Sequence, residues 1–377
     1  MSHVVKRIAV AGLNHGHKLA KRVIANNRAK LVGINAPSRP DNIALSRELG
    51  APLYDNIETM LDMESPEGVI VATPTHLLHR TAMACIRRGI HCLIEKPMSN
   101  SVGEAEEILL SSSANGARIL VGYHRRYSKR VDAIRKLINS NELGRLIAVN
   151  CLWLVLKPEN YYSDREWRTN KNQGGGPLFI NASHEIDLLR HLCGNVIKVV
   201  AIAGRGRENY PNVVPTFGVL LSLENEAVCT LLFCDKAPSP FSYETTAREN
   251  PAYPSYDEDC YQFFFEKGSV SFPSLRVYQM QPDSVQGWFD VLDERVSPQE
   301  QSVAFDPLDA EIEHFIDVLD GSSSSVCGVR DALQTLQTLW AIQRAVETGA
   351  SVSVGSKATR VGVADNKWEA QDENIES

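Results

Sequence analysis

The sequence has no apolar run long enough to cross a lipid bilayer, which takes about 18 consecutive apolar residues. Its longest run, LIAVNCLWLVL (146–156), contains an asparagine and is rich in residues that favour a buried β-strand. It also has no leader pattern, because the chain enters an apolar strand within its first ten residues. We therefore expect a cytoplasmic protein without a membrane partner.

Excess positive charge and clustered metal ligands are also lacking. The 39 Lys and Arg against 46 Asp and Glu give a formal charge of −7, which argues against nucleic acid or an anionic membrane surface as the main partner. The eight cysteines form no C-x-x-C pair and no Cys/His cluster at metal spacing. Most lie in apolar segments, where a thiol acts as a small hydrophobe. We expect reduced thiols and no bound metal.

The first third of the chain alternates short apolar runs with amphipathic helical patterns. A length of 377 residues favours two domains. This alternation predicts a parallel, doubly wound sheet, an α/β Rossmann dinucleotide-binding domain over residues 1–125. The predicted strands are RIAVAG (7–12), KLVGINA (30–36), GVIVAT (68–73), HCLIEK (91–96) and RILVGY (118–123).

The pattern changes after a predicted helix that ends at Gly144. Long β-rich runs joined by polar, Pro-containing loops then predict an α+β domain over residues 126–355, with a large, mainly antiparallel sheet. The runs are 146–156, 196–204, 216–234 and 260–272, and helical patterns follow at 309–321 and 329–349. The final helix could pack back on the first domain. Residues 356–377 are polar and predict a flexible tail.

The turn after the first predicted strand, GLNHGH (12–17), is poor in glycine for a phosphate-binding loop. In the usual G-x-G-x-x-G spacing, Gly12 fits, Asn14 takes the second glycine position and His17 the third, while Gly16 comes one place early. Asparagine tolerates left-handed backbone better than most residues, so the turn could survive the change. The predicted pyrophosphate cradle is Gly12, Asn14, His15, Gly16 and His17.

The segment from Arg28 to Pro40 lacks the acidic residue that normally binds the ribose 2′-hydroxyl of NAD. It carries Ser38 and Arg39 instead, and a guanidinium can meet a 2′-phosphate with two charge-assisted hydrogen bonds. The alternative is that Arg39 is an ordinary solvated loop residue. We expect NADP rather than NAD.

Several motifs in order resemble the glucose–fructose oxidoreductase/inositol dehydrogenase (Gfo/Idh/MocA) family, from residue 5 to about residue 355. They are ATPTHLLHRTAMACIRRGIHCLIEKPMS (72–99), VGYHRRYSKRV (121–131), GGGPLFINASHEIDLLRHLCG (174–194) and the C-terminal VRDALQTLQTLWAIQRAVETGASVSV (329–354). The family's T-P…H and E-K-P segments, its G-F-N-R-R-F segment and its H-x-x-D-L segment fall on Thr73, Pro74, His79 (with His76 the less favoured match), Glu95, Lys96, Pro97, His124, Arg126, His184 and Asp187.

This resemblance implies an NAD(P)-dependent oxidoreductase in which Lys96 and His184 are catalytic. A lysine fixed at a strand end near apolar walls loses hydration, so its pKa falls toward neutrality and it can exchange a proton with a hydroxyl. The alternative for Lys96 is a surface lysine capping a helix, and for His184 a structural imidazole, which is our interpretation of His191. The family also implies a frequent cis peptide before the motif's proline, and cofactor contacts from Thr73, Pro74, His79, Glu95, Lys96, Pro97 and Arg126.

One departure from the family concerns the substrate. Inositol-dehydrogenase-like members place an Asp four residues before the catalytic His, and here that position is Ile180, followed by Asn181. An amide cannot take a proton, but it can orient a substrate oxygen. Aromatic and cationic side chains in 153–168 would suit a ring and an anionic group. The predicted substrate residues are His124, Lys157, Tyr161, Trp167, Arg168 and Asn181.

We therefore predict an NADP-dependent oxidoreductase that transfers a hydride to or from a carbinol or carbonyl carbon of a small cyclic polyol, sugar or sugar-acid-like molecule. A redox-neutral lyase or hydrolase that oxidises its substrate transiently is one alternative. A cofactor-sensing regulator is another, although galactose-pathway repressors of the same fold lack the full E-K-P segment. The family also implies a homo-oligomer, a dimer or tetramer, formed through the antiparallel sheet.

Overall fold

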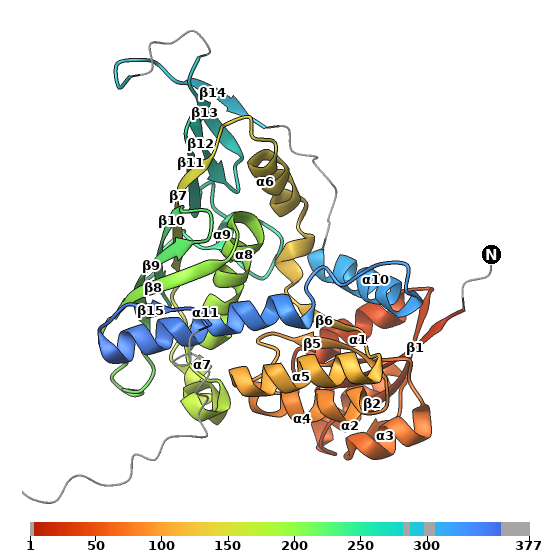
Figure 1. Cartoon of the computed structure of the whole chain (residues 1–377). Coiled ribbons are helices and arrows are strands. Elements are labelled where there is room, and N and C mark those ends of the chain that lie inside the picture. The colour runs from red at the N-terminus through yellow and green to blue at the C-terminus, as the bar shows by residue number, and fades with distance from the viewer. Residues whose placement is uncertain (1–3, 282–286, 298–305, 356–377) are drawn as a thin grey trace, which may run out of the picture.

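The computed structural model describes residues 4–281, 287–297 and 306–355. It contains a six-stranded sheet A and a nine-stranded sheet B, each with its own helices, arranged side by side (Figure 1). The expected combination of a Rossmann domain with an α+β domain is therefore confirmed. The predicted tail, residues 356–377, lies outside the described residues.

Sheet A is entirely parallel, with strand order β3-β2-β1-β4-β5-β6. Its strands are continuous apolar runs because helices cover both faces. The five predicted strands are present; β3, only two residues long, was not predicted. The elements are β1 (Lys6–Ala11), α1 (Gly16–Ala25), β2 (Ala29–Asn35), α2 (Pro40–Leu49), β3 (Leu53–Tyr54), α3 (Ile57–Glu64), β4 (Gly68–Val71), α4 (Thr75–Ile86), β5 (His91–Glu95), α5 (Val102–Asn115) and β6 (Ile119–Gly122).

A helix from the far end of the chain completes the first domain. One face of sheet A packs against α1, α2 and α10 (Pro307–Asp320), and the other against α3, α4 and α5. Phe315 and Ile316 of α10 are fully buried in the same core as Ile8 and Val10 of β1. Figure 1 shows α10 beside α1 and β6, which makes the first domain discontinuous in sequence.

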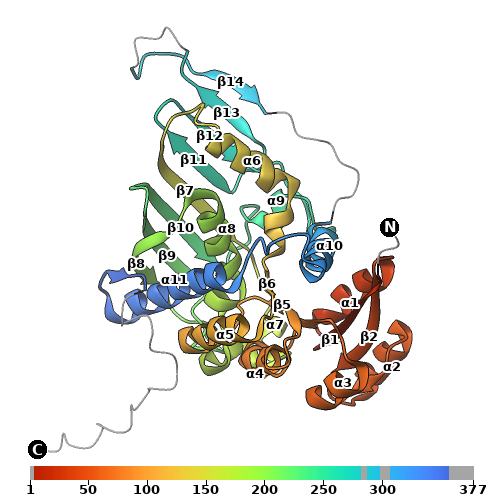
Figure 2. The ribbon, with the colours of Figure 1, turned by 45° about the vertical axis from the view of Figure 1, so that its right-hand side comes forward.

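Sheet B has the order β14-β13-β12-β11-β7-β10-β9-β8-β15, and β7 and β10 form its parallel pair. Helices α6 (Lys129–Asn139), α8 (Ser183–Cys193) and α11 (Val329–Thr348) lie on one face, and the other face is open (Figure 2). The strands are β7 (Leu146–Leu154), β8 (Val196–Ala203), β9 (Thr216–Leu223), β10 (Val228–Cys234), β11 (Tyr261–Phe265), β12 (Gly268–Phe272), β13 (Arg276–Gln279), β14 (Asp293–Val296) and β15 (Val352–Ser353).

Two expectations about helices have different outcomes. The helix predicted to end at Gly144 ends five residues earlier: Ser140 caps it, donating from its hydroxyl to the carbonyl of Leu137, and Asn141 takes a left-handed φ of 58°. Ser and Asn compete with helical hydrogen bonds through their own side chains, which explains the early end. The final helix, α11, does contact α5 of the first domain, as expected.

Among the described residues, no helix combines the length and the apolar character needed to cross a membrane. All eight cysteines are buried, unpaired thiols. No group of three or more His, Cys, Asp or Glu side chains that could hold a metal ion occurs in the described ranges.

Candidate active site

The β1–α1 turn lies at the carboxyl edge of sheet A, and its two glycines have different structural roles. Gly12 has a φ of 91°, and a Cβ there would lie 2.4 Å from the carbonyl oxygen of Ala72, so only glycine fits. At Gly16 a Cβ would lie 2.9 Å from Cγ1 of Val10. Gly16 therefore provides the close helix–strand packing usually given by the third glycine, one position early.

The two unusual residues of the turn also have defined contacts. The Nδ1 atom of His17 lies 3.1 Å from the carbonyl oxygen of Leu13 and 2.7 Å from that of Asn14. Both partners are acceptors, so Nδ1 carries the proton and the ring braces the turn. Asn14 is exposed, and its Oδ1 accepts a hydrogen bond of 3.3 Å from Nη2 of Arg165, a residue of the second domain. Arg165 was not among the predicted site residues.

The neighbouring β4–α4 turn adds a hydroxyl without a partner. Oγ1 of Thr73 is buried and unbonded, and Pro74 is the residue before the first turn of α4. The glycine cradle, this hydroxyl and the amino ends of α1 and α4 fit a dinucleotide pyrophosphate. Nε2 of His79 lies 3.0 Å from Glu107 on α5. Among the described residues, neither this atom nor the buried Nδ1 of His76 has a hydrogen-bond partner.

An acidic residue does lie at the end of β2, but it comes from the next strand. Asp55, directly after β3, accepts hydrogen bonds of 2.6 Å from both the backbone nitrogen and the hydroxyl of Ser38. These bonds lower the pKa of the Asp55 carboxyl. Arg39 is exposed and has no ion-pair partner among the residues that the structure describes. The expected Ser38–Arg39 turn is thus accompanied by an acid that was not predicted.

Lys96 lies at the end of β5 and points toward the second domain. Its Nζ donates a 2.7 Å hydrogen bond to the carbonyl oxygen of Ile180, and the Lys96–Pro97 peptide is cis, as the family resemblance implied. Burial lowers the pKa of Lys96 to about 8, against the opposing effect of Glu95. Glu95 in turn lies 3.4 Å from Nε2 of His15 in the β1–α1 turn. The structure therefore places these residues of the turn and the E-K-P segment together.

Two histidines face each other next to Lys96. His184, in the first turn of α8, has its ring centroid 5.1 Å from that of His124, at an interplanar angle of 70°. Nδ1 of His184 is buried without a partner. Burial, and then the charges of Lys96 and Arg125, lower the pKa of His184 well below its usual value, and burial lowers that of His124 to about 3. Both imidazoles are therefore neutral near pH 7.

Consecutive arginines hold α8 in this position. Arg125, in the 3-10 turn η1 (His124–Tyr127), donates 2.5 Å and 2.6 Å hydrogen bonds to Glu185 and Glu244. Arg126 makes a bidentate pair with Asp187, at 2.9 Å and 2.6 Å. Arg125 and Arg126 directly follow His124 in the sequence. Their partners, Glu185 and Asp187, lie shortly after His184 in α8. Arg125 and Glu185 were not predicted, because the pairing spans 60 residues.

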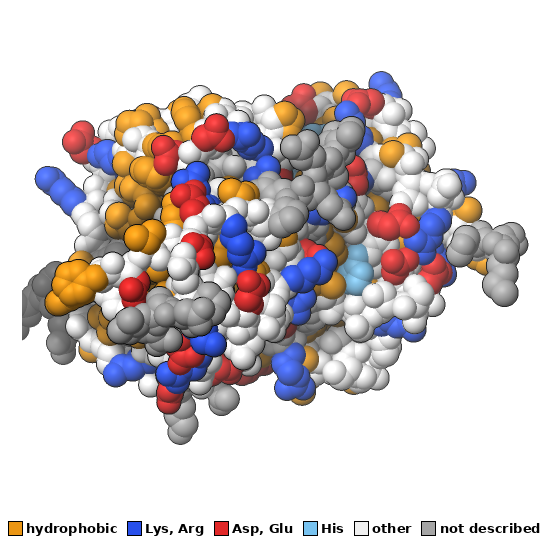
Figure 3. Space-filling model, turned by 90° about the horizontal axis from the view of Figure 1, so that it is seen from above, with side chains coloured by type: hydrophobic (Ala, Val, Ile, Leu, Met, Phe, Trp, Pro, Cys, Tyr) orange, Lys and Arg blue, Asp and Glu red, His pale blue; other side chains and the backbone are white. Residues whose placement is uncertain are grey.

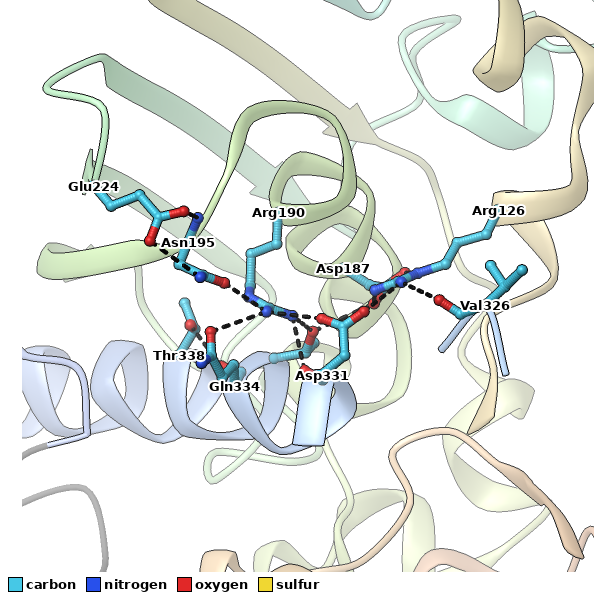
Figure 4. A network of polar contacts seen from close by, with 10 residues as sticks. Arg126, Asp187, Arg190, Asn195, Glu224, Val326, Asp331, Gln334 and Thr338 are labelled. Atoms are coloured by element: carbon cyan, nitrogen blue, oxygen red, sulfur yellow. Dashed lines mark hydrogen bonds and ion pairs between the residues drawn. The ribbon is translucent and has the colours of Figure 1, made fainter. Parts of the chain in front are cut away.

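Figure 4 shows Arg126 in a network of polar contacts with Asp187, Arg190 and Asp331. Its Nη1 also binds Asp331 of α11 at 2.5 Å, and Arg190 of α8 binds the same carboxylate at 2.9 Å. Only 2% of the Arg126 side chain is exposed. Arg126 was predicted to contact the cofactor; the structure instead uses its guanidinium to tie η1, α8 and α11 together.

The predicted substrate residues form a wall across from Lys96. Lys157 donates to Oδ1 of Asn181, in the π-helical turn η4 (Leu178–Ala182), and its Nζ lies 4.3 Å from the ring centroid of Tyr161. The guanidinium carbon of Arg168 lies 4.1 Å from the same centroid. Nε1 of Trp167 is buried without a partner. The structure therefore brings Lys157, Asn181, Tyr161 and Arg168 together, and Asn181 directly follows Ile180, whose carbonyl oxygen accepts from Lys96.

A cavity of about 320 Å³ borders His124 from the side of α1 and α10. His124 and Arg125 line it together with Lys18 and Arg22 of α1 and Glu244 of α9 (Tyr243–Thr246). His124 therefore contacts both this cavity and the ring of His184.

A parallel sheet with a glycine turn at its carboxyl edge, next to a buried lysine and a neutral histidine, defines a dinucleotide-dependent oxidoreductase fold. Residues 6–123 match the family model described as an oxidoreductase family with an NAD-binding Rossmann fold, and residues 135–354 match its C-terminal alpha/beta domain. The chain belongs to the Gfo/Idh/MocA oxidoreductase family, as the sequence motifs indicated.

Curated relatives align with about half of their own length. The chain is 26% identical over 213 residues to 2,7-anhydro-N-acetylneuraminate hydratase of Escherichia coli, covering 55% of this chain and 54% of that protein. It is 30% identical over 163 residues to scyllo-inositol 2-dehydrogenase (NADP(+)) IolW of Bacillus subtilis, covering 43% of this chain and 45% of that protein.

Solved structures agree in fold over almost the whole chain. The WlbA dehydrogenase of Bordetella pertussis, in complex with NADH and UDP-GlcNAcA, aligns with a TM-score of 0.73 and 20% identity over 93% of this chain and 99% of that one. An oxidoreductase of Agrobacterium radiobacter, in complex with NAD+, L-tartaric acid and magnesium, aligns with a TM-score of 0.74 and 14% identity over 93% and 98%. At these identities the likeness concerns the fold.

Proposed function

We propose that this chain is a cytoplasmic, NADP-dependent oxidoreductase acting on a carbinol or carbonyl carbon of a small cyclic polyol, sugar or sugar-acid-like molecule. The observation that carries the proposal is the cluster of Lys96, His124 and His184 at the carboxyl edge of sheet A, beside the glycine cradle. Eight buried free thiols suit a reducing compartment.

The chain's own residues would handle the proton. A bound nicotinamide would supply the hydride acceptor or donor. In the oxidation direction, neutral Lys96 takes the proton of the substrate hydroxyl, and the neutral imidazole of His184 hydrogen-bonds the same oxygen or shares the proton. Asn181, held by Lys157, orients a second substrate oxygen. Arg125 and Arg126 fix α8, so that the distance between the two proton-handling groups is maintained.

The preference for NADP is tested at Arg39. The exposed guanidinium of Arg39, which has no ion-pair partner in the described part of the chain, supports binding of a 2′-phosphate. Asp55 supports binding of the 2′-hydroxyl of NAD. In fluorescence titrations we expect tighter binding of NADPH than of NADH. Arg39→Ala should weaken NADPH binding by roughly 10- to 100-fold, the loss of charge-assisted hydrogen bonds, and leave NADH binding unchanged.

Asp55→Asn provides the contrasting variant for the same titration. Removal of the negative charge should leave NADPH binding equal or tighter if Arg39 and Ser38 receive a phosphate. Preferential binding of NADH by the wild type, lost in Asp55→Asn, would instead show an NAD enzyme. Binding of neither nucleotide would rule out the oxidoreductase.

A redox-neutral reaction is the second candidate, because one relative is named a hydratase. In that case the substrate is consumed while the nicotinamide returns to its starting oxidation state in each cycle. Nicotinamide absorbance separates the two: a dehydrogenase accumulates reduced cofactor in proportion to product, and a hydratase or lyase does not. The regulator is disfavoured, since Lys96 and His184 are both in place.

We also propose that the chain forms a homo-oligomer through the open face of sheet B. Apolar side chains alternate outward on its strands, and Figure 3 shows hydrophobic side chains gathered on the side where Figure 1 places this face. An apolar sheet face of this kind favours association. The residues are Ile147, Ile197, Val200, Ile202, Leu220, Val228, Leu232 and Phe264.

A double charge substitution tests this interface. Val200 and Leu220 are cross-strand partners on β8 and β9, and both are exposed. We expect Val200→Glu with Leu220→Glu to convert the oligomer to a monomer in sedimentation experiments, because charged groups would have to be buried without partners. Leu110→Glu, at an exposed apolar residue of α5, is the control that should keep the oligomer. A monomeric wild type would contradict the proposal.

A further inference from the structure

Lys157 is an unusual lysine, because its side chain is buried although most of the groups around its Nζ are uncharged. Its side chain is 10% exposed. Its Nζ contacts Asn181 Oδ1, lies over the ring of Tyr161 and is 3.5 Å from Oδ2 of Asp235. An enclosed ammonium is costly unless an anion compensates its charge, so the question is which anion does so.

The nearby Asp235 is already compensated by another residue. Arg207 donates from Nη2 to Oδ1 and to the backbone oxygen of Asp235, both at 2.8 Å. The hydroxyl of Tyr162 donates to Oδ2 of the same carboxylate. Arg207 and Asp235 thus form a buried ion pair with hydrogen bonds on both oxygens. Arg207 also binds Glu159 at 3.0 Å, and Lys157 therefore shares Asp235 with an arginine and has no carboxylate of its own among the described residues.

The same wall carries more positive charge than negative. Lys96 and Lys157 bind adjacent residues, the Ile180 carbonyl and the Asn181 amide, so their ammonium groups lie close together. Arg168 lies against the ring of Tyr161, which Lys157 also contacts, and its Nε is buried without a partner. The family's carboxylate at position 180 is replaced here by isoleucine. Nη1 of Arg168 lies 3.9 Å from Asp164, which is 63% exposed. Among the buried groups of this wall, basic side chains therefore outnumber carboxylates, and the acid that would accept a neutral polyol's hydroxyl is lacking.

We propose that the substrate carries a carboxylate and that Lys157 binds it, with Arg168 as a second donor. This proposal rests on the proposed function, since it names the substrate class of the same site. The substrate is then a hydroxylated ring with a carboxylate, its reacting carbon at Lys96 and His184 and its carboxylate at Lys157. Each of its charged hydrogen bonds is worth roughly a factor of 10 to 100 in affinity.

The chemistry of the wall favours a carboxylate over a phosphate. Lys157 already donates to Asn181 and lies close to Asp235, which leaves few of its three protons free, whereas a dianionic phosphate requires several donors. The ring of Tyr161, which Lys157 and Arg168 both contact, suits the face of a cyclic molecule. Phosphorylated sugars therefore form a separate arm of the test.

The experiment is calorimetric titration of the protein saturated with NADP+, using matched probes. Quinate and glucuronate are the carboxylated probes, myo-inositol and glucose their neutral counterparts, and glucose 6-phosphate the phosphate arm. We expect at least one carboxylated probe to bind roughly 10- to 100-fold more tightly than its neutral counterpart. This comparison needs no variant, so it does not depend on how substitutions affect folding.

The variant Lys157→Met should remove that preference, with carboxylate affinity falling to the level of the neutral probes. Lys157→Arg should keep part of it. Lys30→Met, at an exposed lysine on β2, is the control that should behave as wild type. Thermal unfolding and NADPH titration of each variant show whether the protein remains folded and competent to bind cofactor.

The possible results separate the two proposals. If neutral probes bind as tightly as carboxylated ones, or if only the phosphate arm binds, the carboxylate proposal is overturned and the oxidoreductase stands. If Lys157→Met weakens neutral and carboxylated probes equally, Lys157 is structural and the proposal is also overturned. If the wild type does not bind NADP(H), the proposed function itself fails.

Discussion

Lys96→Met is expected to lower kcat by roughly 10²- to 10⁴-fold, the usual contribution of a positioned proton-transfer group. The Nζ of Lys96 donates to the carbonyl of Ile180, and burial and then the charge of Lys96 lower the pKa of His184, beside which the reacting oxygen would lie. Binding of NADPH should change little, because the glycine cradle at Gly12 and the turn of Thr73 are independent of this side chain. The measurement is kcat for the best substrate of the carboxylate panel, with NADPH affinity measured in parallel.

The pKa of Lys96 also predicts the direction in which kcat changes with pH. Burial lowers the pKa of Lys96 to about 8, with Glu95 and Glu244 opposing and Arg125 assisting. In the oxidation direction the lysine must be neutral, so kcat should rise with pH and level off above about 8. In the reduction direction it must be protonated, so kcat should fall above the same pH. The pKa of Lys157 is also about 8, but its loss of charge should raise KM for a carboxylated substrate rather than change kcat.

Two controls separate proton transfer from charge. Lys96→Arg keeps the positive charge but cannot accept a proton near neutral pH, so it should be as inactive as Lys96→Met in oxidation. Lys30→Met, at an exposed lysine of β2, should keep full activity. If Lys96→Arg is active in oxidation, or if its pH profile is the same as that of the wild type, Lys96 acts only through its charge.

Asp187→Ala is expected to lower the free energy of unfolding by about 3–5 kcal/mol, since it leaves the guanidinium of Arg126 buried without its bidentate partner. Both side chains are almost inaccessible, with 2% and 3% exposed. Asp331 still contacts Arg126, which favours the lower part of this range. The measurement is chemical denaturation at neutral pH in the absence of cofactor.

The matched control is an exposed ion pair of the same type. Asp62 pairs with Arg88 at 3.1 Å and is 67% exposed, so Asp62→Ala should leave stability nearly unchanged. A second expectation concerns function: Asp187→Asn should raise KM more than it lowers kcat, because α8 and His184 shift relative to Lys96. Equal stability of Asp187→Ala and Asp62→Ala would show that the Arg126 network does not stabilise α8.

The sequence predicted the carboxyl edge of sheet A well for a physical reason. Strands buried on both faces read as continuous apolar runs, and the residue after each run therefore lies at the same edge of the sheet. Gly12 was found in this way, and the family motifs assigned Thr73, Lys96 and His124, which follow β4, β5 and β6. The sequence shows that Gly16 lies one position before the third glycine of the usual motif. Only its packing against Val10 shows that it takes over the role of that glycine.

The contacts that the sequence missed are those between residues distant in the chain. Asp55 follows a two-residue strand, too short for any periodic pattern, yet it binds Ser38. Arg126 was matched to a cofactor contact by its motif, but its partners lie 61 and 205 residues away. Likewise, the helical pattern of the sequence showed that α10 has an apolar side. It did not show that this side packs against sheet A.

A crystal structure of the protein with NADPH tests the central claim most directly. The expected result is a nucleotide with its pyrophosphate at residues 12–16, its 2′-phosphate at Ser38 and Arg39, and its nicotinamide directed toward Lys96 and His184. A nucleotide whose nicotinamide points away from Lys96, or no bound nucleotide at saturating concentration, would contradict a hydride-transfer site at this edge of sheet A.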